Sequence, residues 1–279
     1  MFDTHTHLNF HTLDGKTEEI IRQANDAGVT HFVVPGTDFS TSQKAVELAN
    51  TFAKHNVYAA VGIHPHHVFE AQQKGEESYS ADIKKIEGLL ADKRVVAVGE
   101  VGLDRHYYEA TKYQNYNVTE EFIKTQQAIF NEHVKLALTH DKTLIIHHRE
   151  AKKDLLECLA EVWSGSLARR SVIHCCEPDH DLLAYAKEHK LFIGVDGDVT
   201  YDKNKQAFIK EVPLDMLVLE TDAPFLIPEP HRSKPRDVRG PNVPAYLTLI
   251  AEKVAKVKDI SVDEVQKATF ENAMELFRL

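Results

Sequence analysis

The sequence predicts a single α/β domain spanning residues 1–279, a (β/α)₈ barrel of the TIM-barrel type. Short β-branched runs alternate with amphipathic helical segments along the whole chain. The 279 residues, of which 43% are hydrophobic, are close to the roughly 250 that such a barrel usually occupies. No stretch has the composition of a linker. A doubly wound open sheet shows the same alternation, so periodicity alone leaves these two folds open.

Eight segments have the apolar, β-branched composition of buried parallel strands. They cover residues 2–7, 31–35, 57–64, 95–103, 143–148, 171–175, 191–195 and 216–222. Side chains alternate between the two faces of a strand, so Val96, Val98 and Glu100 are expected on one face of the fourth segment. In a barrel, the carboxyl ends of all eight strands meet at one mouth, where catalytic residues lie.

Segments with helical periodicity separate most of the strands and follow the last one. They cover residues 18–27, 81–90, 120–139, 152–162, 179–188, 203–210, 243–257 and 261–277, and a further helix is expected to open at Ser40. Capping boxes, Ser40 with Gln43 and Ser261 with Glu264, predict where two helices begin. Residues 64–79, 105–119 and 224–244 lack periodicity and are expected to be irregular loops.

Composition restricts the class of protein. The net charge of −10 argues against a broad basic groove that grips duplex DNA, although bound cations could still attract a phosphate substrate. The three cysteines, Cys158, Cys175 and Cys176, form no disulfide framework, which favours a reducing compartment. No apolar run is long enough to span a bilayer, and the N-terminus has no secretory signal, so a cytoplasmic protein without membrane contact is expected.

Side chains that bind metals end five of the predicted strands. They are His5, His7, Glu100, His147, His174 and Asp222. His5 and His7 are two residues apart in one strand and therefore point to the same side. Most of the others end a run that otherwise has the composition of buried core, where a carboxylate is costly unless it is paired or bound to a metal. The set predicts a site for divalent cations at the barrel mouth.

Strand geometry gives neighbouring residues different roles. Only one of the adjacent His147 and His148 can face the barrel interior, and we expect it to be His147. Asp222 ends the eighth strand and is the better ligand and general base, whereas Glu220 lies one layer deeper and should support the site or contact substrate. We interpret His64, at the end of the third strand, as facing the substrate in catalysis, with a structural role as the alternative.

Eight short motifs follow one another along the chain from residue 2 to residue 277. They are 2–7 (FDTHTH), 62–65 (GIHP), 98–104 (VGEVGLD), 145–151 (IIHHREA), 172–175 (VIHC), 219–225 (LETDAPF), 239–244 (RGPNVP) and 272–277 (NAMELF). Each motif is only moderately specific by itself. In this order and at these spacings they resemble the TatD-type metal-dependent deoxyribonucleases of the metal-dependent hydrolase superfamily.

The resemblance implies a TIM barrel with a two-metal centre in which Glu100 bridges the cations. One cation would be held by Glu100 with His5, His7 and Asp222, and the other by Glu100 with His147 and His174. The positions that match substrate contacts of the family are His64, Arg149, Arg239 and Asn242. Family members are typically Mg²⁺- or Mn²⁺-dependent DNases, often 3′→5′ exonucleases on single strands.

The chain departs from the family pattern in three places. It has His148 where a small polar residue is common, Cys176 where an aromatic residue is common, and a longer stretch at 105–119. The tyrosines of that stretch could stack on bases or could simply pack the loop against the barrel; they are Tyr107, Tyr108, Tyr113 and Tyr116. These departures bear on substrate choice and leave the expected metal ligands intact.

The predicted enzyme cleaves phosphodiester bonds of DNA, preferentially single-stranded and from the 3′ end, with a metal-activated water. Asp222 would be the general base, while Arg149 and Arg239 would hold phosphate oxygens. Two divalent cations are expected, Mg²⁺ or Mn²⁺ in function, and Zn²⁺ can occupy purified protein because imidazole ligands suit it. A monomer is the default expectation.

Two other functions stay open at this point. An amidohydrolase or carboxyl-ester hydrolase acting on a small molecule or an aminoacyl ester would share the fold and the metals. The acidic net charge mildly favours such a small substrate. A binding or scaffold protein with a decayed centre would lack ligands, whereas all six positions in this chain carry competent side chains.

Overall fold

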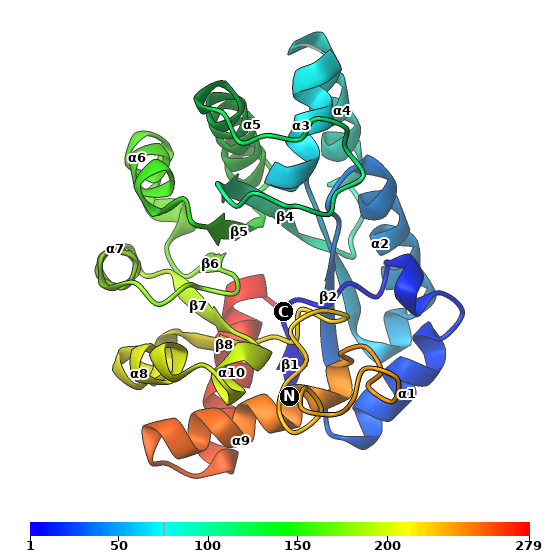
Figure 1. Ribbon diagram of the computed structural model, residues 1–279, viewed down its shortest axis with the longest axis vertical. Helices are drawn as coiled ribbons and strands as arrows, with labels where there is room; N and C mark the ends of the chain where they lie inside the picture. The colour runs from blue at the N-terminus through cyan, green and yellow to red at the C-terminus, as the bar shows by residue number, and fades with distance from the viewer. Residues whose placement is uncertain (75) are drawn as a thin grey trace.

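The computed structural model describes residues 1–74 and 76–279, and these form a ring of eight parallel strands surrounded by helices (Figure 1). The strands are β1 (Phe2–Asp3), β2 (His31–Pro35), β3 (Val57–Val61), β4 (Val95–Asp104), β5 (Thr143–Arg149), β6 (Ser171–Ile173), β7 (Phe192–Val195) and β8 (Leu217–Leu219). Their order around the ring is their order in the chain, and neighbouring strands pair in parallel.

The chain just beyond β1 also contacts the chain around β8. The backbone N–H of Thr4 donates to the carbonyl oxygen of Leu219 at 3.1 Å, and Thr6 forms a parallel bridge with Ala223. A doubly wound sheet would leave its two edge strands far apart, so this contact excludes it. The predicted barrel is confirmed. Several strands end earlier than predicted, although the chain beyond them keeps hydrogen bonds to its neighbours, such as that from the N–H of His174 to the carbonyl oxygen of Ile146 at 3.0 Å.

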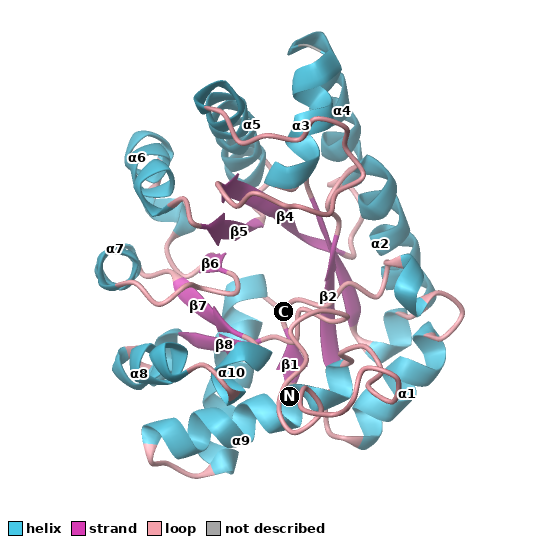
Figure 2. Ribbon diagram, viewed as in Figure 1, coloured by secondary structure: helices cyan, strands magenta, loops and turns pink. Residues whose placement is uncertain are grey.

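Helices cover the outside of the ring (Figure 2). They are α1 (Thr17–Asp26), α2 (Phe39–Thr51), α3 (Pro65–Lys74), α4 (Glu76–Leu89), α5 (Glu120–Thr139), α6 (Lys152–Val162), α7 (His180–His189), α8 (Lys203–Glu211), α9 (Leu247–Lys258) and α10 (Val262–Phe277). The prediction of an irregular segment at 64–79 is wrong, since α3 and α4 occupy its described residues. Pro65 begins α3, where the ring of proline suits the first helical turn. Within the described part of the chain, none of the helices is long and apolar enough to cross a bilayer.

Helix starts were predicted correctly at one capping box and wrongly at the other. Ser261 caps α10 and accepts a hydrogen bond from the backbone N–H of Glu264. The N-cap of α2, however, is Asp38. Its carboxylate accepts a hydrogen bond from the backbone N–H of Thr41, and the hydroxyl of Thr41 accepts one from the backbone N–H of Asp38. The helix therefore begins before Ser40, because an aspartate is as good an N-cap as a serine.

Two apolar cores hold the barrel together. The larger one lies between the strands and the surrounding helices, and the smaller one fills the barrel interior, where Ala273, Leu276 and Phe277 of α10 close the floor. Val98 packs in the outer core, whereas Glu100 faces the mouth, so the prediction that they share a face is wrong. The pairing register of β4 with β5 shifts between Val98 and Val101, and this shift breaks the simple alternation.

Candidate metal centre

The six predicted ligands come together at the carboxyl ends of the strands. His5 and His7 follow β1, Glu100 lies in β4, His147 in β5, His174 follows β6 and Asp222 follows β8. A pocket of about 510 Å³ opens above them, lined in part by His7, Glu100, His147, His174 and Asp222. Residues from five places in the sequence thus share one site because the parallel strands end at one mouth.

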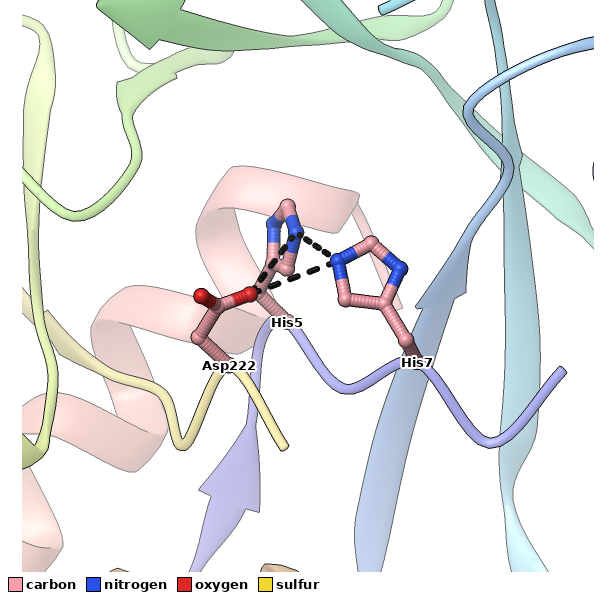
Figure 3. A group of neighbouring side chains, drawn as sticks. All are labelled: His5, His7 and Asp222. Carbon is pink, nitrogen blue, oxygen red and sulfur yellow. Dashed lines mark hydrogen bonds and ion pairs between the residues drawn. The ribbon is translucent and has the colours of Figure 1, made fainter. Parts of the chain in front are cut away.

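The first donor group consists of His5, His7, Asp222 and one oxygen of Glu100. The rings of both histidines turn toward Asp222 (Figure 3). The two Nε2 atoms are 3.3 Å apart, and they lie 3.8 Å and 3.3 Å from Asp222 Oδ1. Glu100 Oε2 is 3.3 Å from His5 Nε2 and 3.6 Å from His7 Nε2. Tetrahedral ligands about 2.1 Å from a cation are about 3.4 Å apart, so this spacing fits a metal site.

The second donor group gathers on the other oxygen of Glu100. Glu100 Oε1 lies 2.7 Å from His147 Nδ1, 3.1 Å from His174 Nε2 and 3.5 Å from His64 Nε2. His64 Nε2 is also 3.2 Å from His147 Nδ1. Each carboxylate oxygen of Glu100 therefore faces a different set of imidazoles.

Glu100 carries its charge despite being buried. Burial by itself raises the pKa of Glu100, but electrostatic attraction to the surrounding imidazoles of His64, His174 and His5 and a hydrogen bond with His147 outweigh burial and hold the pKa well below its usual value. The ionised carboxylate therefore lies among convergent imidazole nitrogens. That donor set, nitrogen and carboxylate oxygen without thiolate, suits Zn²⁺ or Mn²⁺ and admits Mg²⁺.

The rings of His5 and His7 have their polar contacts on the metal-facing side. Their Nδ1 atoms are buried and have no hydrogen-bond partner among the described residues. The contacts of these two rings with Glu100 and Asp222 are made through Nε2, where the lone pairs converge with two carboxylates. A cation at this point would satisfy nitrogens that otherwise face one another.

Two further acids hold the imidazoles of the second group. Asp104 Oδ2 lies 3.2 Å from His147 Nε2, and Glu220 Oε1 lies 3.3 Å from His174 Nδ1 while accepting a 2.5 Å hydrogen bond from the backbone N–H of Cys175. Burial lowers the pKa of His147, but hydrogen bonds with Asp104 and Glu100 outweigh it and raise the pKa to about 9. Such outer partners fix the orientation of ligating histidines.

Sequence reasoning assigned no role to Asp104. It is buried and is the last residue of β4. An ionisable residue at the end of an apolar strand was the signal that identified the metal ligands, and Asp104 carries the same signal. Its carboxylate also accepts a 2.7 Å hydrogen bond from the hydroxyl of Tyr108.

The residues expected to contact substrate divide into two groups. His64 and Arg149 line the pocket, and the guanidinium of Arg149 lies over the ring of Tyr108 with its NH1 atom 3.3 Å from the hydroxyl. The described residues that line the pocket do not include Glu220, Arg239 or Asn242.

Contacts with His174 and with backbone carbonyl groups hold those three residues in place. Glu220 is buried beneath His174. The amide of Asn242 is buried and donates to the carbonyl oxygen of Thr221 at 2.7 Å, and Arg239 donates to the carbonyl oxygen of Arg232 at 2.7 Å. Glu220 and Asn242 therefore support the site in this structure, and a substrate contact by Arg239 stays a prediction.

The tyrosines of the 105–119 loop do not act as one platform. Tyr113 and Tyr116 pack on Phe69 of α3, with ring centroids 5.5 Å and 5.1 Å away. Tyr108 lines the pocket, and Tyr107 is 56% exposed. Packing of the loop is thus the role of Tyr113 and Tyr116, and only Tyr108 reaches the site.

One protein family matches almost the whole length of this chain. The family model described as TatD related DNase matches residues 2–278. The chain belongs to the TatD family. It is therefore a metal-dependent hydrolase that cleaves ester bonds, and the two donor groups around Glu100 are its candidate metal-binding residues.

TatD relatives match this chain over its whole length. The metal-dependent hydrolase YabD of Bacillus subtilis is 33% identical over 281 residues, covering 100% of this chain and 99% of YabD. The 3′-5′ ssDNA/RNA exonuclease TatD of Edwardsiella piscicida is 31% identical over 282 residues and covers 100% of both. The crystal structure of YJJV, a TatD homolog from Escherichia coli K12, superposes with a TM-score of 0.82 at 26% identity, covering 100% and 98% of the two chains.

Proposed function

We propose that this TatD-family hydrolase is a 3′→5′ exonuclease that removes nucleotides from single-stranded DNA with two divalent cations. The observation that carries the proposal is Glu100, whose two oxygens face separate imidazole groups 2.7–3.6 Å away. Two adjacent cations are a recurring arrangement in enzymes that cleave phosphodiester bonds. Relatives that are named 3′-5′ ssDNA/RNA exonucleases, at about 31% identity, favour this substrate.

Asp222 and Arg149 have separate tasks in this reaction. When bound, the cations would polarise the phosphoryl group and lower the pKa of water. Asp222 lines the pocket with its side chain 14% exposed, so it can accept the proton of an attacking water. Arg149, on the pocket wall, presents a planar guanidinium to the phosphate oxygens.

His64 takes part as a neutral hydrogen-bonding group. Burial first, and then the charge of His147, hold the pKa of His64 well below its usual value. Its Nδ1 atom accepts the backbone N–H of His66 at 3.1 Å, so the neutral ring carries its hydrogen on Nε2 and can donate to the substrate without repelling the cations. This role agrees with its position 3.5 Å from Glu100 and with its place among the residues that line the pocket.

The test uses metal-stripped protein and a 5′-labelled single-stranded oligonucleotide. Mg²⁺, Mn²⁺ and Zn²⁺ are added back separately to wild type, to Glu100→Ala and to Glu252→Ala. Glu252 is exposed on α9, which makes Glu252→Ala a matched control for the loss of one carboxylate. The expected result is a ladder that shortens stepwise from the 3′ end, depends on added metal, and disappears only in Glu100→Ala.

Intact DNA with all three metals, in protein shown by elemental analysis to contain metal, would contradict the nuclease proposal. The candidate function would then be hydrolysis of an amide or a carboxyl ester, which the same metal centre can support. A ladder that survives in Glu100→Ala would contradict the assigned role of Glu100.

A further inference from the structure

One wall of the pocket is aromatic and comes from the segments after β1 and β8. Phe10, Phe225 and Leu226 line it. The ring of Phe10 stacks on the imidazole of His7 at 4.3 Å between centroids, and Phe225 meets Phe10 edge-on at 5.9 Å. Phe225 is 50% exposed. An aromatic surface therefore starts at a residue of the metal centre and continues out to solvent.

The wall across the pocket is polar and includes one guanidinium group. It comes from the ends of β4 and β5, which lie across the ring from β1 and β8 (Figure 1), and from the start of α3. Arg149, Tyr108 and His66 line it. The guanidinium of Arg149 sits 5.3 Å from the centre of the Tyr108 ring, which holds the charge at the pocket edge. The metal centre thus lies between an apolar wall and a polar wall that carries the guanidinium of Arg149.

This division of the pocket matches the chemistry of a nucleotide. A nucleotide joins a planar base, which stacks on aromatic rings, to an anionic phosphate, which pairs with guanidinium groups. A phosphodiester held at the metal centre would leave a neighbouring base on the phenylalanine side and further phosphate on the arginine side. A small aliphatic ester has no group that would use an exposed aromatic surface.

We propose that Phe10 and Phe225 form a subsite that stacks on a nucleobase next to the scissile phosphate. The inference rests on the proposed nuclease function and goes further, because it names the part of the substrate that the aromatic wall binds. Stacking of this kind is tolerant of sequence, since every base has a π-face. The subsite therefore recognises the presence of a base and not its identity.

The test compares two 5′-labelled single-stranded oligonucleotides of one length and sequence. The first has ordinary bases, and the second lacks the bases of its two 3′-terminal nucleotides. The kcat/KM of the first cleavage is measured with Mn²⁺-loaded wild type, Phe225→Ala, Phe225→Tyr and Tyr107→Ala. Phe225→Tyr keeps a ring at the subsite, and Tyr107→Ala removes an exposed ring that does not line the pocket.

In wild type, removal of the bases should lower kcat/KM about 10-fold, equivalent to about 1.4 kcal/mol and within the range for base–aromatic stacking. Phe225→Ala should lose the same factor on ordinary DNA and lose nothing more on the base-free end. Phe225→Tyr and Tyr107→Ala should behave as wild type.

Three results would overturn the inference. The first is wild-type activity of Phe225→Ala on ordinary DNA. The second is an equal loss by Phe225→Ala on both substrates, which would indicate a purely structural role for the ring. The third is a wild type that cleaves neither oligonucleotide, which contradicts the nuclease function itself and is thereby distinguished from failure of the subsite alone.

Discussion

Replacement of Glu220 should weaken metal binding although no proposed ligand is changed. Glu220 is 1% exposed, and its Oε1 atom lies 3.3 Å from His174 Nδ1 and accepts the N–H of Cys175 at 2.5 Å. The carboxylate fixes the ring of His174 so that Nε2 faces Glu100 at 3.1 Å. Loss of such an outer partner typically lowers metal affinity about 10–100-fold.

Two substitutions separate the charge of Glu220 from its shape. Glu220→Gln keeps an oxygen that can accept the N–H of Cys175 and lie beside His174 Nδ1, so it should cost about 10-fold in affinity, or about 1.4 kcal/mol. Glu220→Ala removes the acceptor altogether and should cost about 100-fold. It also leaves the Cys175 N–H without its partner, which should lower the free energy of unfolding by about 1–3 kcal/mol.

The assay is competition between metal-stripped protein and a chelator for Zn²⁺, with urea unfolding measured in parallel. Glu252→Gln, on the exposed surface of α9, is the control for the loss of one negative charge. Zn²⁺ binding as tight as that of wild type in both Glu220 variants, correctly folded, would refute the role of Glu220 in positioning His174. A weakening of the same size in Glu252→Gln would show that net charge and not the contact with His174 is responsible.

Three further substitutions test stability and substrate binding. His133→Leu should make the protein more resistant to acid. Burial lowers the pKa of His133 to about 4, whereas the same histidine in the unfolded chain binds a proton below about pH 6.5. Wild type should therefore lose ~2.5 kcal/mol of unfolding free energy through this residue between about pH 7.5 and 4.5, and the variant should not. Urea unfolding at both pH values checks this, and an identical pH dependence would contradict it. Lys205→Met should lower the free energy of unfolding by about 3–5 kcal/mol, because Asp196 stays buried without the cation 3.5 Å away; urea unfolding close to that of wild type would disprove it. Arg149→Ala should reduce kcat/KM on oligonucleotides roughly 10-fold at low salt, with a smaller loss at high salt, and a loss independent of salt would argue against phosphate contact.

The positions of the metal ligands could be predicted because of how parallel strands end. His147 and His174 each follow an apolar run at the carboxyl end of a strand, Glu100 interrupts an apolar run within β4, and a barrel brings these strand ends together. The same rule would have identified Asp104, which was overlooked because the motif that contains it was interpreted through Glu100. The division of these ligands into two donor groups came from family resemblance, and the strand pattern alone did not indicate it.

Other features depend on geometry that no periodic pattern encodes. The shift in register between Val98 and Val101 reverses the face expected for Val98, and it arises from pairing with β5, a segment distant in sequence. The 224–244 loop has no regular repeat, so nothing in its sequence shows that the amide of Asn242 turns inward to the backbone of Thr221. Residues that follow strands were thus predictable, and those within long loops were not.

The floor of the barrel is built from residues near both ends of the sequence. The rings of Phe2 and Phe277 lie 5.5 Å apart beneath the strands, so residues from opposite ends of the sequence complete one apolar cluster. This cluster is therefore complete only when α10 is in place. The same proximity suits circular permutation: residues 1 and 279 joined by a short linker, with new ends placed in the 105–119 loop, should restore the same floor. Recovery of metal-dependent activity by such a permuted chain would show that the barrel depends on these contacts and not on the order in which its segments are joined.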